Sequence, residues 1–115
     1  MPYVLYRAIK GSGARVSDFW SAFALGDEPF PIQLKEPLEW VGVSTFSDLA
    51  QANRTALLWR QGRFLAELHI PDAPRNALVL KTGKQSSSHH SVLATPHTLL
   101  SFVDRILPIT EESTP

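Results

Sequence analysis

The sequence predicts a single mixed α+β domain of small size. Its 115 residues are enough for one modest hydrophobic core and too few for two independent cores. Hydrophobic residues make up 43% of the chain and charged residues 19%, a composition typical of globular proteins. Roughly five strand-like segments are interrupted by two or three helical segments, without the regular alternation of a doubly wound fold. We therefore expect one domain over residues 1–110 and a flexible C-terminal tail over 111–115.

The first third of the chain predicts a strand, a helix and a loop. Residues 3–9 are rich in tyrosine, valine and isoleucine and end at a glycine-containing turn, which indicates a strand with Arg7 inside it. Residues 17–25 start with a capping serine and carry apolar side chains at helical spacing, and Gly26 is a suitable C-terminal stop. Residues 27–37 contain three prolines, which lack the backbone donors of a helix or a central strand, so we expect a surface loop there.

The middle of the chain predicts a second strand, a long helix and a third strand. Residues 38–46 are largely apolar and form the second strand. A helical pattern then runs from residue 47 to about residue 61, and Gly62 is expected to end it. Residues 63–70 alternate between two faces, as a strand with one fully buried face does. The aromatic residues at helical spacing in the two predicted helices are expected in the core: Phe19, Trp20, Phe23 and Trp59.

The last third predicts a strand, a loop, a short helix and a closing strand. Residues 77–81 form the strand, and residues 82–88 form a polar loop with little to pack, which we expect to be the most mobile segment. Thr95 is a suitable N-cap and Pro96 suits the first position of a short helix. Residues 102–109 then form the closing strand.

Charge and cysteine content narrow the classes of partner. Eleven basic and eleven acidic side chains cancel, so we expect neither nucleic acid nor an anionic membrane as the partner. The absence of cysteine excludes disulfides, thiolate metal sites and a cysteine nucleophile. The N-terminal segment has no basic leader, and no run approaches the roughly 20 apolar residues of a membrane span, so we expect a cytoplasmic protein.

Three polar residues in the predicted strands are candidates for a binding site. Arg7 is costly to bury unless it is paired, and its planar guanidinium suits phosphate or carboxylate. Ser44 and Thr45 follow Gly42, and a glycine in a strand often marks a close approach of a ligand or another backbone. A structural interpretation stands beside each: Arg7 paired to a surface acid, and Thr45 as an ordinary strand residue.

The histidines and acids indicate no established catalytic arrangement. His89 and His90 are adjacent on the serine-rich loop, where neighbouring side chains need not converge, and no metal-ligand spacing is recognisable, so we expect no metal. A single histidine acting as acid or base stays open. Glu67 and Asp104 do not form a recognisable catalytic pair, and the Gly-x-Ser-x-Gly motif of a nucleophilic serine is absent.

The Tyr-Arg pair in the first strand and the Gly-Val-Ser-Thr-Phe strand leading into a helix resemble a reduced ADP-ribosyltransferase domain. In that family an arginine or histidine on the first strand contacts the phosphates of NAD, and a Ser-Thr-Ser-like strand shapes the nicotinamide-ribose pocket. The resemblance implies an ADP-ribosyltransferase-like fold, NAD as cofactor, Arg7 at the phosphates, and Ser44 with Thr45 at the ribose.

The chain departs from this family in one catalytic residue. The transferases use a glutamate on a late strand, and no residue here clearly occupies that position; His97 and His90 are candidate substitutes for its polar contacts. The predicted catalytic residues are therefore Arg7, Ser44 and His97, and the predicted NAD-binding residues are Arg7, Ser44, Thr45 and His90.

The sequence leaves three functions open. The first is an NAD or ADP-ribose pocket with ADP-ribosyl transfer or NAD cleavage as its activity. The second is a non-enzymatic module of the accessory or immunity type, which would contact a protein partner through residues 27–37. The third is a small hydrolase or metal-dependent enzyme that uses the histidines.

Overall fold

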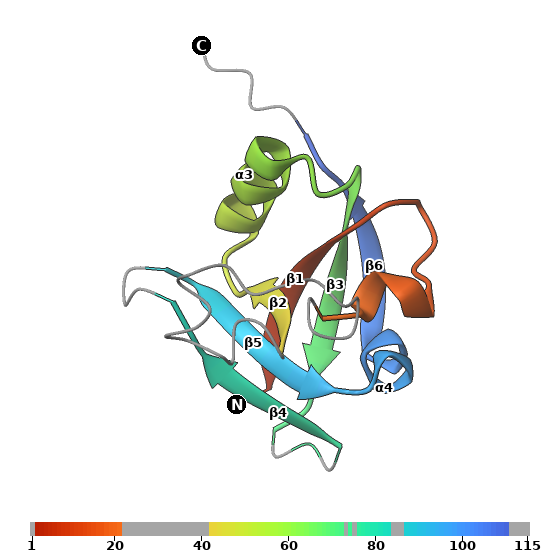
Figure 1. Cartoon of the computed structure of the whole chain (residues 1–115), viewed down its shortest axis with the longest axis vertical. Helices are drawn as coiled ribbons and strands as arrows, with labels where there is room; N and C mark the ends of the chain where they lie inside the picture. Colours follow the sequence, from red (N-terminus) through yellow and green to blue (C-terminus); the bar gives the residue numbers. More distant parts are fainter. Residues whose placement is uncertain (1, 22–41, 73, 75, 84–86, 111–115) are drawn as a thin grey trace.

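The computed structural model describes residues 2–21, 42–72, 74, 76–83 and 87–110. Six strands form one antiparallel sheet in the order β4-β5-β2-β1-β3-β6, accompanied by two α-helices and a 3-10 helix (Figure 1). The strands are β1 (Tyr3–Ile9), β2 (Val43–Phe46), β3 (Phe64–Ile70), β4 (Ala77–Lys81), β5 (His89–Ala94) and β6 (Val103–Pro108). The helices are η1 (Val16–Phe19), α3 (Leu49–Trp59) and α4 (Pro96–Ser101). The predicted mixed α+β class is confirmed.

Side chains on the two faces of the sheet form two separate hydrophobic clusters. On one face, Ala52 and Ala56 of α3 pack on Leu65 of β3. On the other face, a larger cluster joins β-strand residues such as Leu68 to Phe19 of η1 and Leu99 of α4, all of them fully buried. Helices therefore cover both faces of the strands around β3.

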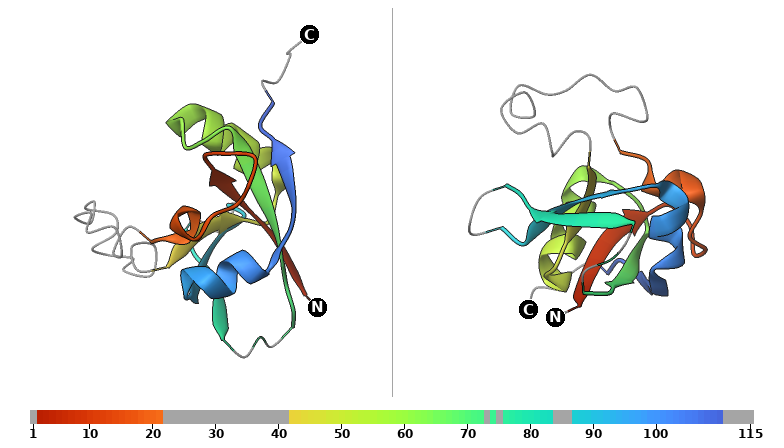
Figure 2. Two further views of the ribbon diagram at one scale, coloured as in Figure 1. Left: turned by 90° about the vertical axis from the view of Figure 1, so that its right-hand side faces the viewer. Right: turned by 90° about the horizontal axis from the view of Figure 1, so that it is seen from below.

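The sheet is strongly twisted. β4 and β5 cross the direction of β1 and β3 in Figure 1, and the right-hand view in Figure 2 shows the same crossing. One consequence is that Tyr3 of β1 reaches His90 of β5 across the intervening strand β2, with ring centroids 6.1 Å apart. A strong twist is usual where only short stretches of neighbouring strands pair, and the β1–β2 ladder has the single register pair Tyr6 and Phe46.

The helix predicted over 17–25 is not continuous, because it is interrupted at Trp20. Among residues 2–21, the helical segment is the 3-10 helix Val16–Phe19, and the backbone of Trp20 is extended, with φ −82° and ψ 132°. The side chain of Arg7 explains the early end, because it donates to the carbonyl oxygens of Asp18 and Trp20. A continuing helix would use both oxygens for its own hydrogen bonds. Phe19 is buried as predicted, whereas Trp20 is 41% exposed.

Several predictions fall on residues 22–41 and lie outside the described residues. They are the end of the first helix with Phe23 and Gly26, the proline-rich loop 27–37, and the start of the strand predicted from residue 38. The described strand there is β2, Val43–Phe46.

Helix α3 forms where predicted but ends earlier than expected. Arg60, not Gly62, ends the helix, and it adopts the left-handed conformation with φ 51°. Gly62 is needed for another reason, because a Cβ atom there would lie 2.2 Å from the carbonyl oxygen of Ile9. Trp59 was predicted in the core, and this prediction is wrong, because its side chain is 69% exposed.

The strand β5 was missed, and its first two residues were wrongly placed in a loop. His89–Ala94 pairs with β2 on one side and with β4 on the other. Its first half, His89 to Ser91, has no strand-favouring residue, so the local strand signal is limited to Val92, and the pairing with two distant strands supplies the stability.

The ends of the predicted loop 82–88 are also better packed than expected. Thr82 is buried, and its N–H donates to the carbonyl oxygen of His89 at 3.1 Å. Ser88 contacts Gln51 of α3, whose Oε1 accepts from the Ser88 backbone N–H at 2.8 Å. Residues 84–86 lie outside the described part.

The remaining predicted elements are confirmed. The strand β3 alternates as predicted, although its second face is buried as well at Leu65 and Glu67. The strand β4 has the predicted bounds. Thr95 caps α4 by accepting from the Thr98 N–H at 3.2 Å, and β6 follows. In the part of the chain that the structure describes, neither helix has the length and apolar character needed to cross a bilayer.

Candidate functional site

Arg7 lies in the middle of β1 and joins three parts of the chain. Its Nε donates to the carbonyl oxygen of Asp18 at 2.7 Å, one terminal nitrogen donates to that of Ser44 at 2.9 Å, and the other donates to that of Trp20 at 3.4 Å. The side chain thereby connects β1 with β2 and with the end of η1. Arg7 and Ser44, which were predicted in one site, are therefore in direct contact, and the contact uses the main-chain carbonyl of Ser44.

The positive charge of Arg7 is hydrogen-bonded to neutral groups. Burial lowers its pKa to about 10, and the nearby Asp18 acts in the opposite direction, so the guanidinium stays charged at neutral pH. Among the described residues, its hydrogen bonds go to carbonyl oxygens and it forms no ion pair. These bonds use three of the five N–H groups of a guanidinium.

Strand pairing places three further polar residues in one line with Arg7. Lys81 pairs with His90, His90 pairs with Thr45, and the neighbouring pair Tyr6 and Phe46 puts Arg7 opposite Thr45. Because directly opposite residues share a face of a sheet, Lys81, His90, Thr45 and Arg7 form a line across four strands. We call these four residues the cationic row.

The two central members of the cationic row have defined hydrogen bonds. Thr45 is fully buried, and its hydroxyl donates to the carbonyl oxygen of His90 at 2.9 Å. His90 is half-buried, and its Nδ1 donates to the carbonyl oxygen of Ser88, with 2.8 Å between the two atoms. Thr45 therefore has a structural hydrogen bond, while the Nε2 atom of His90 has no hydrogen-bond partner among the described residues.

On the opposite face, Ser44 belongs to a chain of hydrogen bonds that the sequence analysis missed. Ser44 Oγ lies 2.6 Å from Nε2 of His89, and Nδ1 of His89 lies 2.7 Å from Thr82 Oγ1. Thr82 Oγ1 lies 2.8 Å from Ser91 Oγ. One signal in the sequence points to this arrangement, since His89 and Ser91 are two residues apart and so lie on the same face of a strand.

The ring of His89 is neutral and firmly held. Burial lowers its pKa to about 4, and the positive charges of His90 and Lys81 lower it further. The ring also packs edge-on against Phe46, with centroids 5.2 Å apart. At neutral pH the ring therefore has one donor nitrogen and one acceptor nitrogen.

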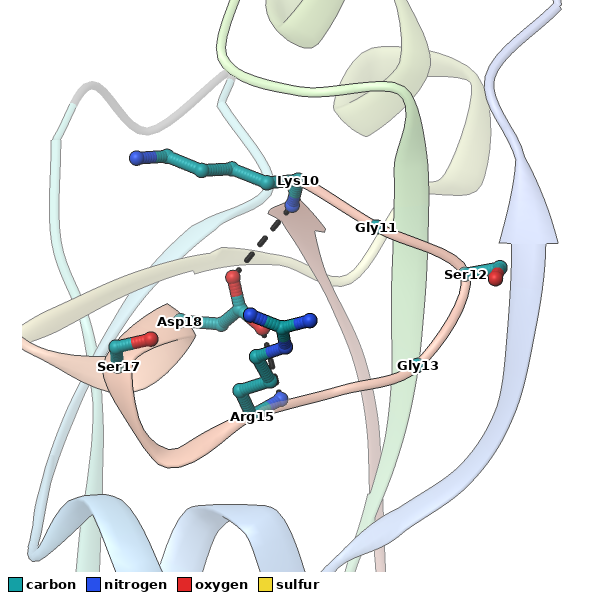
Figure 3. Close-up of a pocket in the computed structure, with 7 residues that line it drawn as sticks. All are labelled: Lys10, Gly11, Ser12, Gly13, Arg15, Ser17 and Asp18. Carbon is teal, nitrogen blue, oxygen red and sulfur yellow. Dashed lines mark hydrogen bonds between the residues drawn. The ribbon is translucent and has the colours of Figure 1, made fainter.

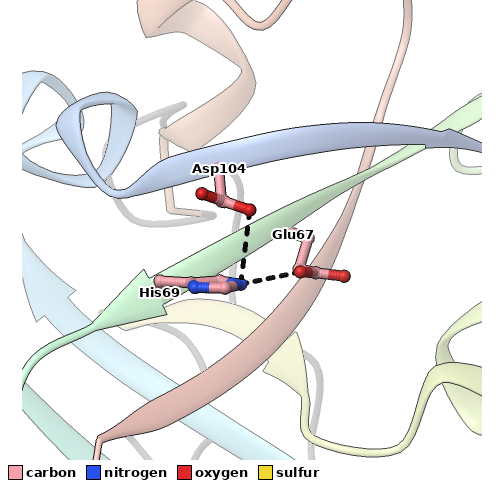
Figure 4. A group of neighbouring side chains, drawn as sticks. All are labelled: Glu67, His69 and Asp104. Carbon is pink, nitrogen blue, oxygen red and sulfur yellow. Dashed lines mark hydrogen bonds and ion pairs between the residues drawn. The ribbon is translucent and has the colours of Figure 1, made fainter.

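A third polar cluster joins β3 to β6 (Figure 4). His69 Nε2 lies 2.7 Å from Glu67 Oε1 and 3.7 Å from Asp104 Oδ2. Arg105 donates to Glu67 Oε2 from two nitrogens, each at 2.9 Å. Burial opposes the charge of Glu67, but the hydrogen bonds from His69 and Arg105 hold its pKa below the usual value. Ligand atoms of Glu67, His69 and Asp104 lie within 4.8 Å of one another, yet both Glu67 oxygens are already bonded, which favours an ion-pair network.

The glycine-containing turn after β1 forms a cavity of about 420 Å³ (Figure 3). The carboxylate of Asp18 points into it and accepts from the backbone N–H of Arg15 at 2.8 Å and of Lys10 at 3.5 Å. These donors are thus satisfied by a side chain of the protein, and the turn is stabilised internally.

His97 is the predicted site residue that stands apart. It lies exposed in the first turn of α4, and none of the described contacts joins it to Arg7 or Ser44. Arg7, Thr45 and His90 lie in the cationic row, and the side chain of Ser44 points to the other face. The comparisons with family models, with curated proteins and with solved structures find no match for this chain.

Proposed function

We propose that this domain binds a nucleotide that contains a pyrophosphate, of the NAD or ADP-ribose type, with Arg7 as a phosphate contact. The observation that carries the proposal is the half-buried guanidinium of Arg7, whose described partners are all carbonyl oxygens. A partly desolvated charge of this kind is costly without a counter-charge, and a phosphate would supply one in the geometry that a guanidinium recognises. The sequence resemblance to ADP-ribosyltransferases supports this proposal, and we propose an ADP-ribosyltransferase-like fold on the same ground.

The other members of the cationic row have distinct roles in this proposal. Lys81 adds positive charge at the far end of the row, which favours the binding of an anionic ligand. Thr45 holds the main chain of His90 in place. Ser44 contributes its carbonyl oxygen, which orients Arg7.

The proposed activity on the bound nucleotide is cleavage of the nicotinamide–ribose bond of NAD, or transfer of the ADP-ribosyl group. Either reaction develops positive charge on the ribose, which a carboxylate stabilises best. Asp18 is the described acid whose charge acts on Arg7, but its carboxylate already accepts two main-chain N–H groups. Binding is therefore the function that the geometry supports best, and cleavage is tested separately from it.

Calorimetric titration with NAD and with ADP-ribose tests binding. We expect binding to the wild-type protein and at least about tenfold weaker binding to Arg7→Lys, which keeps the charge and loses the planar fork. Arg63→Lys is the matched control, because Arg63 is exposed and lies outside the row. Adenosine, which has no phosphate, should not compete.

A second variant keeps the binding test informative if Arg7→Lys does not fold. Lys81→Met changes an exposed residue at the end of the row and should fold normally, with several-fold weaker binding of ADP-ribose. Absence of binding to the folded wild-type protein would contradict the proposed function. Nicotinamide release, followed by chromatography, reports cleavage independently.

A second candidate function is that of a protein-interaction module, and it rests on the C-terminal end of α3. Leu58 is 74% exposed and Trp59 is 69% exposed. Beside them is a cavity of about 600 Å³ whose lining includes Lys10, Arg60 and Arg63 and no acidic residue. This surface fits a partner segment with both acidic and apolar side chains.

Calorimetry with a synthetic acidic, leucine-containing peptide tests this second candidate. We expect binding that Trp59→Ser and Arg60→Glu each abolish and that Lys81→Met leaves unchanged. No binding, or binding unaffected by Trp59→Ser, would exclude this surface as the contact for such a peptide.

A further inference from the structure

The hydrogen-bond chain from Ser44 to Ser91 has the order of groups found in a base-activated nucleophile. A hydroxyl contacts one nitrogen of an imidazole, and the other nitrogen contacts a group that orients the ring. Here these parts are Ser44, His89 and Thr82, with contact distances of 2.6 Å and 2.7 Å. They come from β2, β5 and the residue after β4, so the strand pairing of the sheet brings them together.

One assignment of the His89 ring proton is consistent with the contacts along this chain. If Nδ1 of His89 carries the proton, it donates to Thr82 Oγ1, and the hydroxyl of Thr82 then donates to Ser91 Oγ. Nε2 is left as an acceptor for the hydroxyl proton of Ser44. In this tautomer His89 is positioned to remove that proton.

The surroundings hold the pair rigidly while leaving it accessible. Thr82 and Ser91 are buried, and the ring of Phe46 packs against His89. Ser44 and His89 themselves are only half-buried. Ser44 and His89 therefore keep part of their surface in contact with solvent, whereas Thr82 and Ser91 are buried.

We infer that Ser44 is a nucleophile activated by His89, which reacts with ester or phosphonate electrophiles on the face of the sheet opposite the cationic row. Ser44 Oγ attacks the carbonyl carbon or the phosphorus while its proton passes to His89 Nε2. The bond to the leaving group breaks, and the leaving group takes the proton from the imidazolium. With an ester, water then cleaves the acyl-serine and restores the hydroxyl. This inference is independent of nucleotide binding, because it uses the opposite face.

Labelling of the full-length protein with a fluorophosphonate probe tests the inference. The new bond joins Ser44 Oγ to phosphorus, and the P–F bond breaks to release hydrogen fluoride. Mass spectrometry of the intact protein should show one adduct, and fragmentation should place it on Ser44. Ser44→Ala should abolish labelling, whereas Ser101→Ala, at an exposed serine of α4, should leave it unchanged.

Two further variants separate a catalytic arrangement from a structural one. His89→Gln keeps hydrogen-bonding groups but has no base, and should slow labelling at least about 100-fold. Thr82→Ser retains the orienting hydroxyl and should label close to the wild-type rate, while Thr82→Val should be slower. Circular dichroism checks the folding of each variant. Absence of labelling in the folded wild-type protein, an adduct on another residue, or a rate unaffected by His89→Gln would overturn the inference.

Discussion

At the scale of single residues, two polar side chains decide the arrangement around β2. Arg7 takes the carbonyl oxygens of Asp18 and Trp20, so the chain leaves the helical conformation at Trp20. His89 bonds Ser44 and Thr82 and so connects β2 to the end of β4. The structural role of each residue depends on partners distant in the sequence and could not be predicted from its neighbours in the chain.

The low pKa of His89 predicts that stability depends on pH. Burial, with the charges of His90 and Lys81, lowers this pKa from 6.5 to about 4. Between these values the unfolded chain binds a proton on His89 that the folded protein does not, so stability falls as the pH falls from 6.5 to 4. We expect a loss of about 2 kcal/mol in the free energy of unfolding, after allowance for the partial exposure of the ring.

Urea denaturation of the wild-type protein and His89→Gln at several pH values measures this effect. The variant should lose less stability than the wild-type protein over the same interval, because it has no imidazole to protonate. The carboxylate of Glu67 contributes to both curves at the acidic end and cancels in their difference. Parallel curves for the two proteins would show that His89 does not titrate as described.

At the scale of elements, the connection from α3 to β3 depends on a close backbone contact. The chain passes Ile9 at Gly62, and the N–H of Arg63 donates to the Ile9 carbonyl oxygen at 3.2 Å. Any side chain at Gly62 would collide with backbone atoms, which cannot move aside as a flexible side chain can.

Gly62→Ala is therefore expected to destabilise the protein by about 1–3 kcal/mol, the usual cost of overpacking. Gly11→Ala and Gly13→Ala are matched controls, because a Cβ atom at either position meets nothing within 4 Å. Chemical denaturation compares the three variants. A loss at Gly62 no greater than at the two controls would contradict the close contact.

The pairing of β3 with β6 includes the buried carboxylate of Glu67. Its side chain is 6% exposed and depends on Arg105 and His69 for its hydrogen bonds. Arg105→Met should cost about 1–3 kcal/mol of stability, because it leaves one carboxylate oxygen without its donor. Arg54→Met, on the exposed side of α3, should cost little.

The double variant Glu67→Gln with Arg105→Met tests the cause of this loss. Removing the charge as well as its partner should recover part of the stability. If the double variant is less stable than Arg105→Met alone, the unpaired charge is not the source of the cost.

At the scale of the whole molecule, burial divides the apolar residues into core and surface sets. Leu68 is fully buried in the cluster between the sheet, η1 and α4, whereas Leu58 is 74% exposed at the end of α3. Leu68 therefore belongs to the core and Leu58 to the surface, although both are leucine.

Stability measurements should separate these two sets. Leu68→Ala should cost about 2–5 kcal/mol, the range for a buried leucine. Leu58→Ala should change stability by less than about 0.5 kcal/mol, because most of the Leu58 side chain is already exposed to water in the folded state. Comparable losses at the two positions would mean that the end of α3 is covered, for example by a second copy of the chain, which light scattering would detect.

The sequence by itself determined the mixed α+β class and the elements with strong local signals. The alternation in residues 64–70, the cap at Thr95 with Pro96, and the apolar stripe of α3 each report a local preference of the chain, and the structure contains them. Arg7 and Ser44 were also identified as candidate site residues, because they are polar residues inside apolar strands. Their roles as nucleotide contacts stay predictions.

Only the tertiary structure decided the rest. The strand β5, the early end of η1, and the contact of Ser44 with His89 all depend on partners far along the chain. Ser44 and Thr45 lie on opposite faces because side chains alternate along one strand, but which residues of other strands lie beside them follows from strand register. Local propensity acts over a few residues, whereas these features arise from pairing across tens of residues, so the sequence alone could not reveal them.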